Sequence, residues 1–178
     1  MIILNANDAY NKLGHDKYSE DIKYMCQQTY TYWYETYYKF QLDKYPNWEI
    51  LYDIYMNLAQ NVQTYGYIKG FVAIENDKII GYCSMNLNNF LSNESDKNDK
   101  TEQTLWLSDV YVWENYRNMG LASQLVEQVN KTAKQMDKQI YLCCDDSLIK
   151  FYSNKGWNLI ESVDKLYNIW NIMTFNNK

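Results

Sequence analysis

Hydrophobic residues change their spacing near Tyr65-Gly66, and this change divides the chain into a helical part and a part that contains strands. Before this point, apolar positions recur at steps of three and four residues, which is typical of one helix face. These positions are Trp48, Leu51, Tyr55, Leu58 and Val62. Beyond it, apolar runs at 70–75 and 78–87 flank Asn76-Asp77, which predicts an antiparallel hairpin with a two-residue turn.

The same criteria place the other elements. Helical spacing begins near Tyr18 and continues to about Phe40, whereas 92–103 has no apolar residue and predicts a solvated loop. We also expect helices at 121–136 and 147–154, and strands at 2–4, 105–113, 139–144, 157–160 and 166–175.

Strands and helices therefore mix without a regular βαβ repeat, which predicts an α+β or mixed α/β fold. The 178 residues fit one domain of ordinary size, and neither an internal repeat nor a linker divides them. We accordingly treat 1–178 as a single domain.

Charge and composition exclude several classes of function. The formal net charge of −5 argues against nucleic acid or an anionic membrane as the main partner. No apolar run has the length of a membrane span, and Met1–Leu4 is too short for a signal-peptide core, so we expect a cytoplasmic protein. With four cysteines in no CxxC pair and only His15, we expect reduced thiols and no metal site.

The segment 105–126 carries the strongest chemical signal. A strand leads through Arg117 and Gly120 into a helix, and free N–H groups at a helix start bind anions. Gly120 lets phosphate oxygens approach the backbone, and Arg117 can add a full charge. The alternative is a helix start whose glycine serves tight packing. The chain contains neither a P-loop nor a dinucleotide GxGxxG motif.

This arrangement resembles the GNAT superfamily of N-acetyltransferases. Its motif (Q/R)xxGx(G/A) stands here as 117–122, RNMGLA, and its later tyrosine and Gly-Phe pair match Tyr152 and Gly156-Trp157. The hairpin 70–87 matches the family's second and third strands. The resemblance covers about residues 68–162 as the coenzyme-binding core, and it leaves the helical part 18–65 as the acceptor side.

The resemblance implies a GNAT-like central, mostly antiparallel sheet with a splayed parallel pair, flanked by helices on both faces. It also implies acetyl-CoA as the acetyl donor, without a metal. The pantetheine arm would bind the main chain of Val110, Tyr111 and Val112. The pyrophosphate would be held beside Arg117 by consecutive backbone amides, those of Asn118, Met119, Gly120, Leu121, Ala122 and Ser123.

Acetyl transfer to an amine needs a base, an oxyanion donor and an acid for the leaving thiolate. The resemblance makes Tyr152 the acid, against the alternative of an aromatic that only packs its helix. Asp109 is the first candidate base, because alternation places it on the apolar face of Leu107 and Tyr111, where burial would raise its pKa. A bulge, which is expected near this point in the family, would turn Asp109 elsewhere. Glu75 is a weaker candidate, and many relatives use a water chain.

One position departs from the family pattern, because Asp145 stands where an asparagine is frequent. A carboxylate is unfavourable beside phosphates, so we expect Asp145 or Asp146 to cap the short helix instead.

The acceptor side is rich in aromatic residues, at Tyr30, Tyr32, Trp33, Tyr34, Tyr37 and Tyr38. An acidic pocket lined with rings would attract an amine acceptor in its cationic form, whereas the plainer alternative is aromatic packing on the sheet. An inert module that binds a CoA ester or a protein partner, and a transferase of longer acyl groups, are the other readings of this fold. The oligomeric state stays open, with a homodimer as one option.

Overall fold

The computed structural model describes residues 1–35, 37–87, 104–165 and 168–175. The predicted loop at 92–103 and the start of the predicted strand 166–175 lie outside these ranges. No helix in the described ranges has the length and apolar character that crossing a membrane requires.

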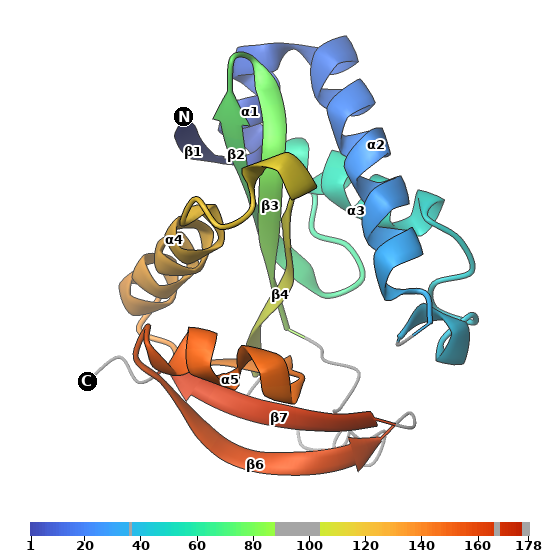
Figure 1. The fold of residues 1–178 in the computed structure, drawn as a ribbon. Helices are drawn as coiled ribbons and strands as arrows, with labels where there is room; N and C mark the ends of the chain where they lie inside the picture. The colour runs from blue at the N-terminus through green and yellow to red at the C-terminus, as the bar shows by residue number, and fades with distance from the viewer. Residues whose placement is uncertain (36, 88–103, 166–167, 176–178) are drawn as a thin grey trace.

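Seven strands form one sheet in the order β1-β2-β3-β4-β5-β7-β6 (Figure 1). The strands are β1 (Ile2–Asn5), β2 (Tyr67–Glu75), β3 (Lys78–Asn86), β4 (Leu105–Val112), β5 (Ile140–Cys144), β6 (Trp157–Lys165) and β7 (Asn168–Phe175). The helices are α1 (Ala6–Leu13), α2 (His15–Trp33), α3 (Glu49–Ala59), α4 (Leu121–Gln135) and α5 (Asp146–Ser153). Short 3-10 turns lie at Tyr38–Phe40 (η1) and Glu114–Tyr116 (η3).

The sheet confirms the predicted mixed architecture. All neighbouring strands are antiparallel except β4 and β5, which run parallel. This parallel pair is joined only at Leu105–Ile140 and Trp106–Tyr141, so β4 and β5 separate beyond their first residues. The turn between β2 and β3 is also as predicted, since Asn76 and Asp77 both have positive φ (49° and 56°), the conformation of a type I′ hairpin turn.

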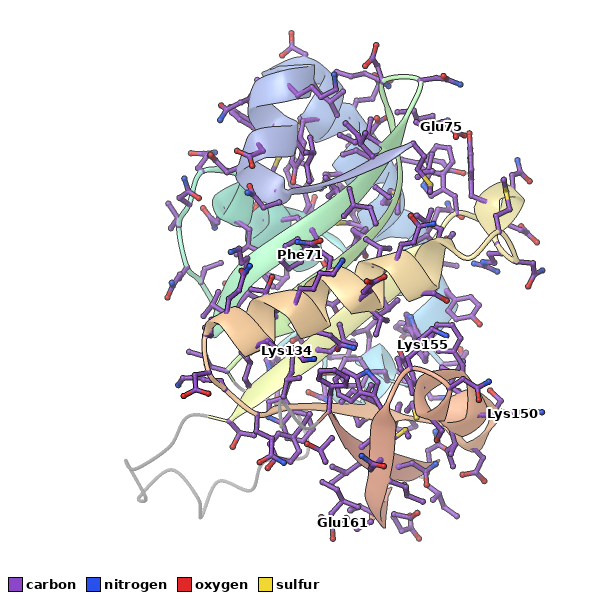
Figure 2. The ribbon with its side chains drawn as sticks, turned by 90° about the vertical axis from the view of Figure 1, so that its left-hand side faces the viewer. Phe71, Glu75, Lys134, Lys150, Lys155 and Glu161 are labelled. Atoms are coloured by element: carbon purple, nitrogen blue, oxygen red, sulfur yellow. The ribbon has the colours of Figure 1, made fainter. Side chains whose placement is uncertain are left out.

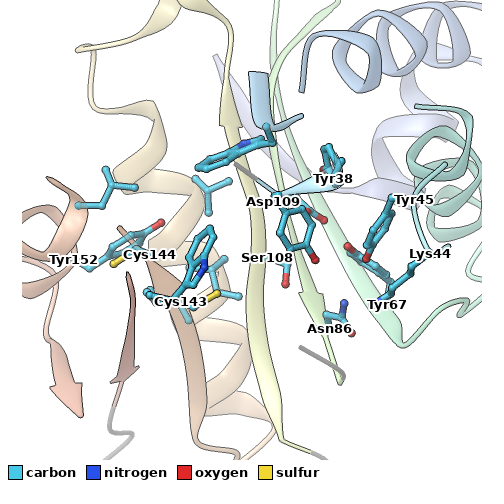
Figure 3. Close-up of a pocket in the computed structure, with 17 residues that line it drawn as sticks. Tyr38, Lys44, Tyr45, Tyr67, Asn86, Ser108, Asp109, Cys143, Cys144 and Tyr152 are labelled. Atoms are coloured by element: carbon cyan, nitrogen blue, oxygen red, sulfur yellow. The ribbon is translucent and has the colours of Figure 1, made fainter. Parts of the chain in front are cut away.

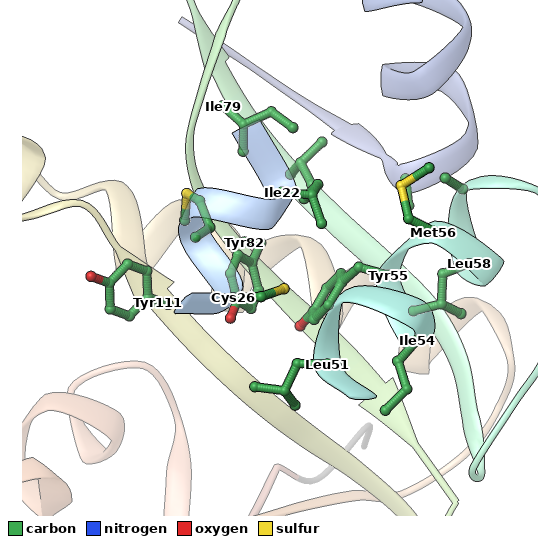
Figure 4. Packing of buried hydrophobic residues seen from close by; sticks show 14 of the residues in the cluster. Ile22, Cys26, Leu51, Ile54, Tyr55, Met56, Leu58, Ile79, Tyr82 and Tyr111 are labelled. Carbon is green, nitrogen blue, oxygen red and sulfur yellow. The ribbon is translucent and has the colours of Figure 1, made fainter. Parts of the chain in front are cut away.

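Helices cover both faces of the sheet. On one face, α1, α2 and α3 bury a core that includes Ile22, Tyr55 and Tyr82 (Figure 4). On the other face, α4 lies across the sheet in front of Phe71, with Leu125 and Val129 in the core beneath it (Figure 2). The two cores meet at the sheet, whose central strands contribute side chains to both.

The N-terminal helices differ from the expectation of one long segment from Tyr18 to Phe40. Helix α2 begins earlier, at His15, and ends earlier, at Trp33. Gly14, at φ +80°, separates it from α1, a helix that was not predicted. Helix α1 escaped detection because it buries only the small residues Ala6 and Ala9, which give a weak hydrophobic signal. Its start is set by Asn5, whose side chain accepts a hydrogen bond from the Asp8 amide at 2.9 Å.

Candidate active site

A β-bulge interrupts β4 at its centre. Tyr111 pairs with Tyr82, but Ser108 pairs with Ser84, so β4 has one more residue than β3 between these pairs. Asp109 lies in this extra stretch with a left-handed backbone, φ 55°. Aspartate is among the few non-glycine residues that adopt this conformation readily.

The bulge corrects the predicted position of Asp109. Alternation placed Asp109 on one face with both Leu107 and Tyr111, but Leu107 belongs to the α4 core and Tyr111 to the core under α2 and α3. The extra residue shifts the alternation by one, so residues on the two sides of the bulge point to different faces. Asp109 contacts the α3 side, through Tyr55.

Asp109 is partly buried, and its carboxylate accepts hydrogen bonds from hydroxyl groups. Ser84 Oγ donates to Oδ2 at 2.9 Å, and Tyr55 Oη donates to the same oxygen at 3.4 Å. Burial raises the pKa of Asp109, while hydrogen bonds from Ser84, Tyr67 and Tyr55 and the charge of Lys44 act in the opposite direction. A carboxylate with a raised pKa suits proton abstraction near neutral pH.

A pocket of ≈ 140 Å³ occupies the separation between β4 and β5 (Figure 3). One wall consists of β5 and α5 and presents Cys143, Cys144 and Tyr152. The opposite wall comes from the segment after α2 and from β2, with Tyr38, Lys44, Tyr45 and Tyr67. The bulge of β4, with Asp109, lies between the two walls, so the pocket brings the two predicted catalytic residues to one cavity.

Tyr152 lies on α5 with 7% of its surface exposed. Burial raises the pKa of its phenol, so the hydroxyl keeps its proton at neutral pH. Helix α5 is held in place at its start by Asp145, whose Oδ1 accepts from the Ser147 amide at 2.9 Å. This confirms the helix cap that we expected from Asp145 or Asp146.

The start of α4 has the form of an anion site. Asn118 and Gly120 both have positive φ (61° and 80°), and a Cβ at Gly120 would meet no atom within 4 Å. No side chain caps the helix, and its first turn opens with Gln124 N donating to Gly120 O at 3.2 Å. The amides of Leu121, Ala122 and Ser123 therefore lack intrahelical acceptors, as in any helix start.

Arg117 differs from the expectation that its charge faces the same anion. Its Nε donates to the Val112 carbonyl at 3.1 Å, and its guanidinium carbon lies 5.6 Å and 5.7 Å from the ring centres of Tyr32 and Tyr111. These contacts are on the α2 face of the sheet, whereas α4 packs on the other face. In this conformation the Arg117 side chain packs the turn before α4 against α2.

The aromatic residues of the acceptor side divide into two groups. Trp33, Tyr37 and Tyr38 line the pocket, together with Trp170 from β7. Tyr30 is stacked on Tyr38 at 4.7 Å, and Tyr32 lies beside Arg117 in a separate groove. The predicted wall is therefore partly pocket lining and partly packing.

Several residues of the site were not predicted as such: Lys44, Tyr67 and Asn86 line the pocket, and Tyr55 and Ser84 donate hydrogen bonds to Asp109. No motif marks them, and tertiary structure alone brings them to Asp109. All four cysteines are free thiols, as expected. Within the described residues, no group of three His, Cys, Asp or Glu side chains is arranged to hold a metal ion.

Comparison with solved structures shows the same fold in acetyltransferases. An aminoglycoside 6'-N-acetyltransferase complexed with coenzyme A superposes with a TM-score of 0.63 at 10% identity, over 100% of this chain and 98% of that one. An aminoglycoside 6'-acetyltransferase type Ii gives 0.57 at 14% identity, with the same coverage. A further acetyltransferase gives 0.59 at 14% identity, over 90% of this chain and 96% of that one.

The sequence matches none of the curated proteins with which it was compared. A family model, by contrast, matches residues 28–157, which include the bulge, the turn before α4 and all of α5. The fold, the separated parallel strands and this match lead to one conclusion. The chain belongs to the acetyltransferase (GNAT) family.

Proposed function

We propose that this protein is an N-acetyltransferase that moves the acetyl group of acetyl-CoA to a primary amine of a small molecule or peptide. The observation that carries the proposal is the position of Asp109 and Tyr152 in one pocket between β4 and β5, in the same chain as the open helix start at Gly120. The two groups supply an acceptor and a donor of protons.

The residues available for the donor fit acetyl-CoA. In this proposal the edge of β4 at Val110, Tyr111 and Val112, which has no pairing with β5, binds the pantetheine arm. The pyrophosphate is held by the amides of 118–123, where the helix dipole adds partial positive charge. We assign Arg117 to orientation of the turn, because its guanidinium already packs on Tyr32 and Tyr111.

The proposed reaction is direct transfer within a ternary complex. When bound, acetyl-CoA supplies an activated thioester. Asp109 accepts the proton that the amine nitrogen loses as its bond to the acetyl carbon forms. A backbone N–H near Tyr111 or Val112 stabilises the oxyanion. Tyr152 then donates its proton to the thiolate as the carbon–sulfur bond breaks, and the solvent restores both groups.

The acceptor wall supports an amine. The rings of Trp33, Tyr37 and Trp170 offer cation–π contact to an ammonium group before it is deprotonated. The aminoglycoside acetyltransferases have the same fold, so aminoglycosides belong in an acceptor screen beside small amines and peptides.

A thermal-shift titration with acetyl-CoA, CoA and ATP tests the donor site first. At a hundredfold excess over Kd, binding stabilises a protein by about 2.7 kcal/mol. We expect a rise in Tm with acetyl-CoA and CoA but not with ATP. Thiol release in the presence of an amine panel then tests turnover. Binding without turnover of any amine would contradict the enzymatic proposal and favour an inert module that binds CoA esters.

A further inference from the structure

Lys44 lies in the pocket on the wall opposite Tyr152 (Figure 3). It follows η1 in the segment that leads to α3, and its side chain is half-buried. Its Nζ is 5.1 Å from the ring centre of Tyr45, which fixes the ammonium group against an aromatic face. The side chain is partly removed from water, and this burial lowers the pKa of Lys44.

The ammonium of Lys44 forms no ion pair with any carboxylate that the structure describes, whereas Lys17 and Lys39 each have one within 3 Å. Asp109 shares the pocket, and its charge raises the pKa of Lys44 against the larger effect of burial. The two groups form no ion pair, however, and Oδ2 of Asp109 already accepts hydrogen bonds from Ser84 and Tyr55. A partly desolvated cation on the wall of a pocket favours an anionic group of the ligand that enters it.

We propose that Lys44 determines acceptor specificity by binding a carboxylate, so that the acceptor is an amine that also bears a carboxylate, as amino acids do. This inference rests on the proposed function and names its substrate class. The amine would lie at the β4 bulge beside Asp109, between Lys44 and Tyr152, and the carboxylate would lie toward Lys44 (Figure 3).

The lining of the pocket narrows the acceptor further. Tyr45, Tyr67 and Trp33 surround the pocket with rings. These rings favour an amino acid-like acceptor whose body is apolar or aromatic.

Matched acceptor pairs test the inference in the full-length protein. Tyrosine with tyramine, and phenylalanine with phenethylamine, differ only by the carboxylate. We expect kcat/KM to be about tenfold to a hundredfold higher for the member with the carboxylate, the range of one charged hydrogen bond. Lys44→Met should abolish this preference, Lys44→Arg should keep it, and Lys44→Glu should reverse it.

Lys39→Met is the matched control, because Lys39 lies within η1, five residues before Lys44, but does not line the pocket and pairs with Glu35 at 2.6 Å. This variant should keep the parent's higher kcat/KM for the acceptor that carries the carboxylate. Equal kcat/KM within both pairs, or a preference that persists in Lys44→Met, would overturn the inference while turnover of amines upholds the proposed function. Absence of acetylation for all four amines and for an aminoglycoside panel would overturn both.

Discussion

The donor side and the acceptor wall of the candidate active site are built from different parts of the sequence. The β4–α4 segment, which we assign to the donor, is continuous from Leu105 to Ser123 and offers mainly backbone groups, at the strand edge and the start of α4. The acceptor wall offers side chains from distant segments, such as Lys44, Tyr67 and Trp170.

This difference affects how the donor side and the acceptor wall respond to substitution. A backbone site depends on the conformation of the chain, so only residues such as Gly120, whose φ is positive, are sensitive there. A side-chain wall can change its chemistry one residue at a time while the fold stays intact, which is how one fold serves many acceptors.

Gly120→Glu should give the largest effect, a loss of acetyl-CoA binding, because its carboxylate would occupy and repel the pyrophosphate site. Gly14→Glu is the matched control, since Gly14 also precedes a helix at φ +80° with no atom within 4 Å of its Cβ position. Both variants should lose roughly 1–2 kcal/mol of stability from backbone strain. Calorimetric titration with acetyl-CoA should separate them, and equal affinities would remove the donor site from this turn.

Tyr152→Phe should lower kcat by about 10²–10⁴-fold, the usual contribution of general acid catalysis, and leave the Kd for acetyl-CoA unchanged. Tyr18→Phe provides the control, because Tyr18 is fully buried in the α2 core and its hydroxyl has no hydrogen-bond partner among the described residues. Its kcat should equal that of the parent. An unchanged kcat in Tyr152→Phe would reduce Tyr152 to a packing residue.

Asp109→Asn should lower kcat by a smaller factor than Tyr152→Phe if water relays part of the proton transfer, and it should change the pH dependence of stability. Burial raises the pKa of Asp109 in the folded state, so the folded protein holds this proton more tightly than the unfolded chain. The associated stability is complete below the unfolded pKa, near 3.9, and is lost as pH rises through the folded pKa. The substituted side chain carries no ionisable group, so the variant does not lose this stability. Its Tm should therefore exceed that of the parent by a growing margin as pH rises from about 3.9 through the folded pKa of Asp109.

Asp21→Asn is the control for that experiment. Asp21 is buried more completely than Asp109, but Lys17 Nζ lies 2.8 Å from its carboxylate and the Ile79 amide donates to it at 2.9 Å. Loss of the charge here should lower Tm at neutral pH, the opposite of the result for Asp109. If melting curves show Asp109→Asn to be less stable than the parent at every pH, the carboxylate is not penalised by burial.

Arg117→Met should have the smallest effect. It removes two contacts with aromatic rings, worth about 0.5–1 kcal/mol each at exposed sites, together with the hydrogen bond to the Val112 carbonyl, and should lower Tm by a few degrees. The Kd for acetyl-CoA should stay within about threefold of the parent value, about 0.65 kcal/mol. A tenfold or larger loss in titration would show that the guanidinium turns to the phosphates when the donor binds.

Local patterns predicted much of this molecule. The hairpin turn at Asn76-Asp77, the strand before the motif and the helix after Gly120 all follow from periodicity and turn chemistry among neighbouring residues. Helix α1 was missed because its buried face consists of alanines. For Asp109, alternation gave the wrong face, and the alternative of a bulge, which depends on pairing with β3, is what the structure contains.

Residues close together in the chain were enough to predict the mixed fold, the motif at 117–122 and the short helix that carries Tyr152. The packing of distant segments was needed to show that Arg117 packs on Tyr32, that Asp109 contacts Ser84 and Tyr55, and that Lys44 lines the pocket. The physical reason is separation along the chain. Contacts between residues that are dozens of positions apart depend on how the layers pack, and no local pattern encodes them.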